Sequence, residues 1–334
     1  MIFRPYSKDT GAAHMAGISF AGRVAVVTGS GGGIGRAHAL ELARRGCALV
    51  VNDLGGDVAG RGGSIHMAES VAAEIVAAGG KAIASHDSVA DSEGAKRIVA
   101  SALARFGRID VLINNAGNMR NALLENTTDE DWSSLIATHL TGSFNMTRAA
   151  WPHFRSQRYG RIVFTASSAG LFGNALQAAY GSAKAGIAGL MNVAAIEGEP
   201  YGILCNAIMP NATGRMAEQM MKDWGPQQRE QGNAMMTGAV GHSMDPAFNA
   251  PLAAYLASEA CTSTHALYSQ CLGRVARVCI GVVPGWQAQR LAPPSVEDIA
   301  EHWAEICDTS RGFATPPSPR DELGLVLRQG PAPA

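Results

Sequence analysis

The feature that most constrains the fold is a regular alternation of short apolar runs with longer helix-like stretches. The first three runs lie at 24–28, 49–53 and 81–86, and stretches of more than ten residues with helical character separate them. Crossovers of that length join parallel strands, whereas antiparallel neighbours need only a tight turn. Because each run is apolar almost throughout, both faces of its strand are expected to be buried. The sequence therefore predicts an α/β fold with one doubly wound parallel sheet and helices on both faces.

The alternation continues well beyond these runs. Further strands are expected at 109–114, 161–167, 203–208, 266–272 and 274–280. Helices are expected at 34–45, 65–78, 92–106, 129–155, 178–196, 246–258 and 295–306. No linker or repeat divides residues 20–310, which predicts a single domain there, with an N-terminal extension at 1–19 and a Pro-rich, poorly packed tail at 311–334.

The charge balance argues against two classes of partner. The chain carries 27 basic and 28 acidic side chains, and they leave a formal net charge of -1 without any basic run. Nucleic acids and anionic membrane surfaces attract a concentrated basic patch, which this sequence lacks. The uncharged stretch 162–183 is interrupted by polar residues, so it is interpreted as a buried strand and a loop. We therefore expect neither nucleic acid nor a membrane as a partner.

The six cysteines are far apart and include no C-x-x-C pair. Neither a zinc site nor a disulfide scaffold is predicted from such spacing, and no metal site is expected. The N-terminal residues lack the apolar core of a signal peptide. Reduced thiols and a cytoplasmic location are therefore expected.

A glycine-rich turn follows the first predicted strand and leads directly into a helix. Its glycines follow the spacing Gly29-x3-Gly33-x-Gly35, which differs from the common G-x-G-x-x-G pattern. Backbone N–H groups at a helix N-terminus can approach a pyrophosphate, and the helix dipole favours its negative charge. The turn is thus a candidate phosphate site of a Rossmann-type fold. A bare tight turn without a ligand is the alternative.

A carboxylate, Asp53, ends the second predicted strand. At this place a carboxylate can accept hydrogen bonds from the adenosine ribose and repel a 2′-phosphate, which favours NAD over NADP. A turn or cap aspartate before Gly55 is the alternative. Arg36 argues in the other direction, because a guanidinium beside the turn can hold a phosphate.

The segment Asn114-Asn115-Ala116-Gly117 follows another predicted strand. Open α/β sheets bind ligands at the carboxyl ends of their strands, so this backbone is expected beneath a cofactor. Because Asn and Gly also form ordinary turns, a structural role is the alternative.

Three polar residues form the decisive group. Tyr180 and Lys184 are four residues apart on a predicted helix, so they share one face, and Ser167 ends a predicted strand. Together with the glycine turn and the Asn114–Gly117 segment, this order and spacing resembles the short-chain dehydrogenase/reductase family over roughly residues 20–275. Any one motif is weak, but their conjunction is specific.

The resemblance implies a hydride-transfer enzyme with catalytic residues Ser167, Tyr180 and Lys184. Tyr180 would act as the base, its phenolate stabilised by the Lys184 ammonium and by the oxidised nicotinamide, because a phenol titrates near 10. Ser167 would hold the substrate oxygen, and Lys184 would also bind the nicotinamide ribose. The residues expected to bind NAD are Gly29, Gly33, Ile34, Gly35, Asp53, Asp87, Ser88, Asn115, Ala116, Gly117, Tyr180 and Lys184.

Two positions depart from the family pattern. His139 stands in the long predicted helix where many members have an asparagine that helps a water molecule relay protons. Its imidazole is a fourth candidate catalytic group, and a packed helix histidine is the alternative. Pro210-Asn211 replaces the usual Pro-Gly, which puts the course of the substrate loop in doubt.

One branch of the family matches more closely. The segments 51–64, 148–151, 159–162, 195–198 and 210–212, and His139, resemble the (3R)-hydroxyacyl-CoA dehydrogenase part of peroxisomal multifunctional enzymes, also called 17β-hydroxysteroid dehydrogenase type 4. The resemblance implies an NAD-dependent oxidoreductase that acts on a secondary alcohol or ketone of a bulky apolar substrate, with 3-hydroxyacyl-CoA favoured over a hydroxysteroid or other alicyclic alcohol. Because no peroxisomal tripeptide ends the chain, a freestanding cytoplasmic enzyme is expected.

The remaining expectations concern the substrate region and assembly. Methionines between 216 and 244, including Met235 and Met236, suit either a mobile lid over an apolar substrate or simple core packing. Arg215 is a candidate partner for a CoA phosphate or an ordinary surface residue. A homodimer or homotetramer through the Tyr180 helix is expected, where Ala185, Gly186, Ala188 and Gly189 permit close approach. A catalytically silent dinucleotide sensor is the alternative of another class.

Overall fold

The computed structural model describes residues 17–223, 225–226, 230, 238–289 and 292–329. The chain divides into two compact units, residues 1–276 and 277–334. The domain expected over 20–310 includes residues of both units, and its limits stay a prediction. Residues 1–16 of the expected extension and 330–334 of the expected tail lie outside the described residues.

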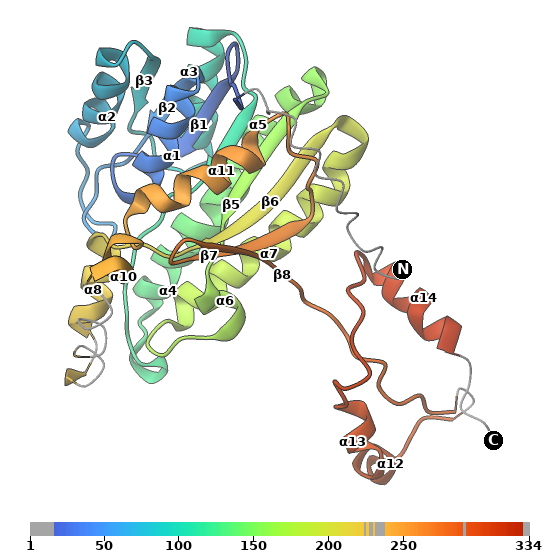
Figure 1. Ribbon diagram of the computed structural model, residues 1–334. Coiled ribbons are helices and arrows are strands. Elements are labelled where there is room, and N and C mark those ends of the chain that lie inside the picture. The colour runs from blue at the N-terminus through green and yellow to red at the C-terminus, as the bar shows by residue number, and fades with distance from the viewer. Residues whose placement is uncertain (1–16, 224, 227–229, 231–237, 290–291, 330–334) are drawn as a thin grey trace. The chain divides into compact units, whose positions relative to one another are not determined.

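Eight strands of the described residues form one sheet, in the order β3-β2-β1-β4-β5-β6-β7-β8 (Figure 1). Their bounds are β1 Val24–Thr28, β2 Ala48–Asn52, β3 Lys81–Ser85, β4 Val111–Asn114, β5 Gly160–Thr165, β6 Ile203–Pro210, β7 Ala266–Cys271 and β8 Arg274–Val278. The neighbours from β3 to β7 are paired in parallel. The strand order reverses between β1 and β4, which is the switch point where such sheets bind ligands. The predicted fold is confirmed.

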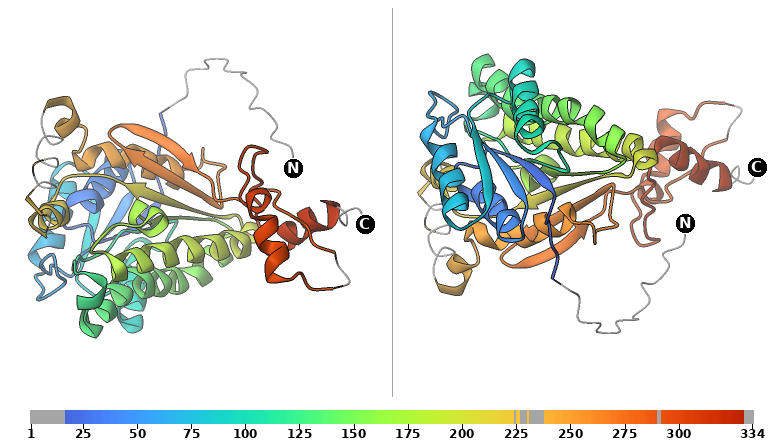
Figure 2. Two further views of the ribbon diagram at one scale, coloured as in Figure 1. Left: turned by 90° about the horizontal axis from the view of Figure 1, so that it is seen from below. Right: turned by 90° about the horizontal axis from the view of Figure 1, so that it is seen from above.

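Helices cover both faces of the sheet, as the two views of Figure 2 show. On one face α1 (Gly33–Arg44) packs against α11 (Ala250–Ala257), and α2 (His66–Ala77) packs on β2 and β3. On the other face α3 (Ser92–Phe106) packs against α5 (Gly142–Gln157), and α7 (Ala178–Gly198) packs on β6. Shorter elements of this unit are η1 (Leu124–Asn126), α6 (Ser168–Phe172), η3 (Glu199–Tyr201) and η4 (Pro246–Asn249).

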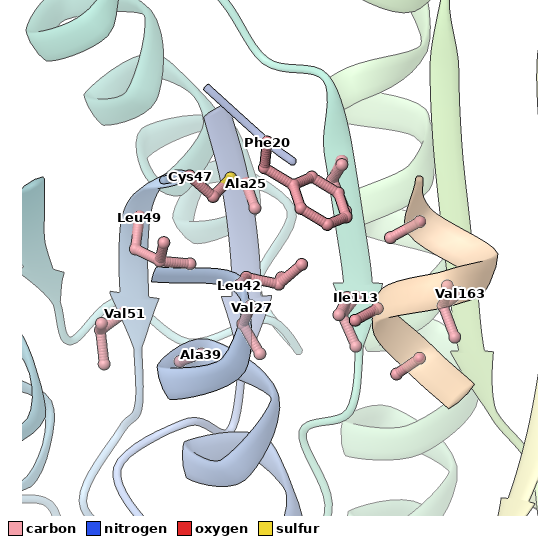
Figure 3. Close-up of a cluster of buried hydrophobic side chains, with 14 of the residues drawn as sticks. Phe20, Ala25, Val27, Ala39, Leu42, Cys47, Leu49, Val51, Ile113 and Val163 are labelled. Atoms are coloured by element: carbon pink, nitrogen blue, oxygen red, sulfur yellow. The ribbon is translucent and has the colours of Figure 1, made fainter. Parts of the chain in front are cut away.

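The core lies between the sheet and α1 (Figure 3). All residues of β1 and β2 are buried, as expected for strands covered on both faces. The side chains of Val27, Leu49 and Ile113 come from three neighbouring strands, and Ala39 and Leu42 of α1 complete the cluster. This packing holds the carboxyl ends of β1, β2 and β4 in fixed positions next to one another.

The long helix expected at 129–155 is divided into three parts. α4 (Asp129–Leu135) leads into a π-helical segment, η2 (Ile136–Thr141), and α5 follows. A π-helical turn holds an extra residue per turn and often occurs at functional sites. Here it contains His139.

The stretch between 211 and 245 contains helices that the sequence analysis did not predict. α8 covers Arg215–Asp223 and α10 covers Gly238–His242. Met216, Met220 and Met221 belong to α8, while Met235 and Met236 lie outside the described residues. The methionines of α8 follow helical spacing, but they were interpreted as lid or core residues, so this helix was not predicted.

The second unit contains α12 (Val296–Glu301), α13 (Trp303–Ile306) and α14 (Pro319–Gln329). None of its described side chains is fully buried. The helix α14 lies within the tail expected from residue 311 and was not expected from the sequence, while the poor packing of this tail stays a prediction. Pro319 starts this helix, at a position where the missing N–H of proline costs nothing.

Two further observations concern membrane-spanning helices and the cysteines. In the part of the chain that the structure describes, no helix combines the length and hydropathy that a membrane crossing requires. All six cysteines are free, and Cys47, Cys205 and Cys261 are buried.

Candidate active site

The glycine turn between β1 and α1 is packed against the loop after β4. A Cβ atom at Gly29 would lie 2.7 Å from the Cα of Ala116, and one at Gly35 would lie 2.2 Å from the carbonyl oxygen of Gly29. Neither position can carry a side chain. At Gly33, with φ of +52°, a Cβ would meet nothing within 4 Å, so this glycine faces open space.

Asn115 holds this turn in place. Its Nδ2 donates to the carbonyl oxygens of Thr28 and Gly29, each at 3.0 Å. The Thr28 hydroxyl in turn accepts the N–H groups of Asn115 at 3.0 Å and Ala116 at 3.1 Å. The predicted cofactor residue Asn115 therefore uses its side-chain Nδ2 and its backbone N–H to join β1 to β4.

Asp53 lies directly beside the glycine turn. Its Oδ2 accepts the N–H of Gly31 at 2.8 Å, and its Oδ1 accepts the N–H of Gly55 at 2.7 Å. The carboxylate is thereby oriented by two backbone donors at the carboxyl end of β2. This is the location that the sequence predicted for it.

The guanidinium of Arg36, which could have held a phosphate beside the glycine turn, is already paired with a carboxylate. Its Nη2 contacts both carboxylate oxygens of Glu74 at 2.7 Å. The other predicted residues, Asp87 and Ser88, follow β3. Asp87 pairs with Arg97 at 2.6 Å, and the Ser88 hydroxyl accepts the N–H of Ala90.

The residues present fit a nicotinamide dinucleotide. The helix α1 starts at Gly33, the preceding Gly32 provides no side-chain cap, and the first turn contains no acidic residue. Its N-terminal N–H groups are therefore suited to a pyrophosphate. Deeper in the same edge, the buried Asn114 Oδ1 has no hydrogen-bond partner among the described residues.

Ser167, Tyr180 and Lys184 come together where β5 and α7 meet. Ser167 caps α6, and a hydrogen bond with Ser167 acts on the phenol of Tyr180. Lys184 Nζ lies 5.6 Å from the centre of the Tyr180 ring and donates to the carbonyl oxygen of Thr165 at 2.6 Å. The predicted arrangement of Tyr180 and Lys184 on one helix face is therefore observed.

Burial is the main cause that shifts the pKa values of Tyr180 and Lys184. It raises the pKa of Tyr180 above its ordinary value, although the hydrogen bond with Ser167 acts in the opposite direction. It also lowers the pKa of Lys184 to about 7. The sequence analysis expected a lowered tyrosine pKa once the dinucleotide is bound. In the protein alone the direction is the reverse, because burial disfavours the charged phenolate.

His139 lies against Tyr180 in an edge-to-face contact, with ring centres 5.2 Å apart. Its Nε2 lies 2.8 Å from the carbonyl oxygen and 3.2 Å from the nitrogen of Asn118. The buried Nδ1 has no partner among the described residues. Burial, followed by the charge of Lys184, lowers the pKa of His139 to about 3, so the ring is neutral. Gly117 must be glycine here, since its Cβ would lie 2.4 Å from Cε1 of His139.

Two polar residues of this region escaped the sequence analysis. Asn118 is buried and fixes His139, and its position directly after the Asn114–Gly117 segment was the available signal. Gln177 is buried before α7, and its Nε2 contacts Met119, Asn121 and Met220. Nothing in its local sequence distinguishes Gln177 from a surface glutamine.

Comparison with known proteins agrees with this geometry. The profile of a family described as short chain dehydrogenase matches residues 23–228, more than half of the chain. A fold with a glycine turn at the switch point, together with this match, defines an oxidoreductase that binds a nicotinamide dinucleotide. The chain belongs to the short-chain dehydrogenase/reductase family.

Three relatives show how far the similarity extends. A Mycobacterium tuberculosis protein named as a short-chain type dehydrogenase/reductase is 43% identical over 288 residues, which are 86% of this chain and 95% of the relative. The mouse peroxisomal multifunctional enzyme type 2 is 41% identical over 93% of this chain, which spans 40% of that enzyme's length. A hydroxyacyl-CoA dehydrogenase of M. tuberculosis, ChsB1, is 40% identical over 58% of this chain and 62% of its own.

A solved structure shows the same relationship. The full-length peroxisomal multifunctional enzyme type 2 of Drosophila melanogaster matches with a TM-score of 0.75 and 30% identity. The match covers 93% of this chain and 50% of the Drosophila chain. The resemblance to the dehydrogenase part of these multifunctional enzymes is confirmed.

Proposed function

We propose that the protein transfers hydride between the secondary alcohol or ketone of a 3-hydroxyacyl-CoA type substrate and NAD. The observation that carries this proposal is the meeting of Ser167, Tyr180 and Lys184 at the end of β5, beside Asn114 and the glycine turn. A phenol, a hydroxyl and an ammonium are there available around one reacting oxygen. A bound nicotinamide supplies the hydride acceptor or donor.

The chain's own residues handle the proton. Ser167 holds the substrate oxygen by a hydrogen bond. Tyr180 accepts the hydroxyl proton when the alcohol is oxidised and returns it when the ketone is reduced. In the protein alone, burial raises the Tyr180 pKa, which keeps the phenol protonated and suited to donation. Oxidation therefore needs a second positive charge near the phenol, which a bound oxidised nicotinamide adds to that of Lys184.

Lys184 and His139 prepare this proton transfer. The bond from Lys184 Nζ to Thr165 ties α7 to the end of β5 and keeps the ammonium near the phenol. His139 keeps a neutral ring against Tyr180, with an unpaired Nδ1. We infer that Nδ1 accepts a hydrogen bond from a water molecule on the proton route to Lys184. A ring that serves packing alone is the alternative.

NAD is proposed over NADP because of two charged groups. The Asp53 carboxylate stands beside the glycine turn, where it would repel a 2′-phosphate. Arg36, which could have held that phosphate, is engaged with Glu74. The pairing of Arg36 with Glu74 therefore weakens the argument for NADP that the position of Arg36 in the sequence suggested.

The substrate class rests on the relatives and on the chemistry near Gln177. One relative is named a hydroxyacyl-CoA dehydrogenase. Near Gln177, the thioethers of Met119 and Met220 offer an adaptable apolar surface. Arg215, the proposed partner of a CoA phosphate, donates to the carbonyl oxygen of Gly56 at 3.4 Å and is exposed.

The test is a substrate panel with the purified protein. With NAD, 3-hydroxyacyl-CoA thioesters should give a rise in absorbance at 340 nm that exceeds the response to hydroxysteroids. A larger response to hydroxysteroids would move the assignment to that class. No response to any alcohol, with intact NADH binding, would indicate the dinucleotide sensor.

We also propose a homodimer or homotetramer. Gly189, Val193 and Ile196 lie on one exposed face of α7, at helical spacing. Gly186 and Ala188 serve a different purpose from the one expected, because Gly186 packs on Leu140 and Ala188 is buried within this chain. Light scattering of Val193→Asp should show smaller particles than wild type.

A cytoplasmic location stays a prediction.

A further inference from the structure

Residues 54–64, here called the strap, run from the end of β2 to the start of α2. The strap is bound to the segment 118–120, which follows β4. Met119 N–H donates to the carbonyl oxygen of Val58 at 2.8 Å, and Arg120 Nε donates to that of Ala59 at 2.9 Å. Since β1 lies between β2 and β4 in the sheet, the strap passes the carboxyl end of β1.

Glycines allow this close approach. Gly55 has φ of +74°, and a Cβ there would lie 2.0 Å from the carbonyl oxygen of Ser64. Gly60 has φ of +78°, and its Cβ would lie 2.6 Å from Nδ2 of Asn118. A side chain at Gly60 would force the strap away from Asn118, and one at Gly55 would break the close contact within the strap between Gly55 and Ser64. The glycine-rich composition of the strap is thus explained by one specific closed conformation.

In the described part of the chain, three side chains donate to strap carbonyl oxygens, and the bond from Arg120 to Ala59 is shorter than those from Asn118 to Ala59 and from Arg215 to Gly56, both at 3.4 Å. The side chain of Arg120 is only 10% exposed, and Nη1 pairs with Glu130 at 2.8 Å and Asp131 at 3.1 Å in the first turn of α4. The hydrogen bond with Glu130 is the main cause that raises the pKa of Arg120. With one end of the guanidinium fixed on α4, Nε is directed at the strap.

The strap is continuous with the residue that selects the cofactor. It starts directly after Asp53, and the N–H of Gly55 within it orients that carboxylate. Among the described residues, the side-chain hydrogen bonds of Arg120 go to Ala59, Glu130 and Asp131, and none goes to Ser167, Tyr180 or Lys184. A change at Arg120 therefore acts on the Asp53 side of the site first.

We propose that Arg120 is a positioning residue for the dinucleotide: through the bond to Ala59 it holds the strap closed, so that Asp53 stays oriented toward the adenosine ribose. The inference rests on the proposed function. Arg120 thus sets cofactor affinity, while the rate of the chemical step depends on Tyr180 and its neighbours.

The first test measures NADH binding by titration calorimetry. Arg120→Met keeps the apolar stem and removes the donors, and it should weaken NADH binding about tenfold, a size consistent with the loss of a charge-assisted hydrogen bond. Gly60→Ala displaces the strap from the opposite side and should weaken binding similarly. Glu130→Gln is the matched control. The glutamine oxygen can still accept from Nη1, Asp131 still pairs with it, and the bond from Nε to Ala59 is kept, so the affinity for NADH should stay within about twofold of wild type.

Two further readouts separate positioning from general damage. The KM for NAD should rise in Arg120→Met with kcat within about twofold of wild type. Trypsin should cut after the exposed Arg61 faster in Arg120→Met and in Gly60→Ala than in Glu130→Gln. Cleavage there is followed by mass spectrometry and needs no cofactor.

The outcomes distinguish the two proposals. If wild type binds NADH and Arg120→Met binds it equally well, the role of Arg120 is wrong and the proposed function stands. A fall in kcat with unchanged affinity, or weaker binding without faster cleavage at Arg61, also overturns the role. A wild type that binds no dinucleotide overturns the proposed function and the role of Arg120 with it.

Discussion

The two sides of the candidate site are built in different ways. On the dinucleotide side, Asp53 and Asn115 spend their side chains on backbone groups of the glycine turn. On the catalytic side, the Nδ1 of His139 and the hydroxyl of Thr165 are buried without partners among the described residues. On the first side these two side chains are held by the protein alone, while the N-terminal N–H groups of α1 and the Oδ1 of Asn114 remain for a ligand. The second needs a ligand or water to satisfy its polar atoms, because unpaired buried groups are costly.

The largest expected effect separates chemistry from binding. Tyr180→Phe removes the phenol that we propose exchanges the substrate proton, so kcat should fall about 1000-fold or more. NADH affinity, measured by titration calorimetry, should stay within about threefold of wild type. An active Tyr180→Phe enzyme would show that the proton takes another route.

On the dinucleotide side, Gly35→Ala tests the close packing. The new Cβ would lie 2.2 Å from a backbone oxygen and 2.4 Å from Asn115 Nδ2. Because backbone cannot move aside cheaply, the free energy of unfolding should fall by about 3 kcal/mol. Gly32→Ala is the control, since its Cβ would be 3.6 Å from the flexible end of Met67. Equal stability in urea titrations of the two variants would contradict the packing argument.

A pH-dependent effect concerns His38 of α1. Both of its ring nitrogens are buried without partners among the described residues, and burial lowers its pKa to about 4 from 6.5. The unfolded chain therefore takes up a proton below pH 6.5 that the folded protein refuses, and stability is lost as the pH falls from 6.5 to 4. The loss amounts to about 3 kcal/mol for this group.

His38→Leu removes this contribution while keeping an apolar side chain of similar size. The difference in unfolding free energy between pH 6.5 and pH 4 should shrink by about 3 kcal/mol, as measured by urea titration at both values. The dependence that remains should include His139, whose pKa is also lowered by burial. An unchanged pH dependence would show that His38 is solvated.

The smallest expected effect concerns cofactor choice. Asp53→Ala removes the carboxylate that would repel a 2′-phosphate, so the preference for NAD over NADP should fall about tenfold to 100-fold. The ratio of kcat/KM for the two cofactors measures this. Asp53→Asn is the matched variant, because it keeps an acceptor and loses the charge. A wild type that already prefers NADP would make the assignment of Asp53 wrong.

Much of the fold was predictable because its signals are local. Each strand of the sheet from β1 to β8 was expected within a few residues. The continuous apolar runs of β1, β2 and β4 mark strands buried on both faces, whereas β3 is only partly buried and β8 is largely exposed. The helices α8 and α14 were missed. The methionines of α8 follow helical spacing but were interpreted as lid or core residues, and α14 begins at Pro319 within a tail that its Pro-rich composition marked as poorly packed.

The candidate site was predictable to a similar degree. Tyr180 and Lys184 are linked by helical spacing, and Asp53 by its place at a strand end, so their positions could be expected. The hydrogen-bond and ion-pair partners of Asn115, Arg36 and His139 could not be predicted from the sequence. Each of these contacts joins segments that are distant along the chain, and local spacing contains no record of them.

By itself the sequence determined the sheet, its parallel direction and the identity of the reactive groups, because hydrophobic period and residue spacing act within a few turns of chain. The tertiary structure alone decided how those groups ionise and what holds them. Burial lowers the pKa of Lys184 to about 7, and a single arginine ties the strap to α4. Desolvation and long-range hydrogen bonds depend on which surfaces meet, and only the folded chain specifies that.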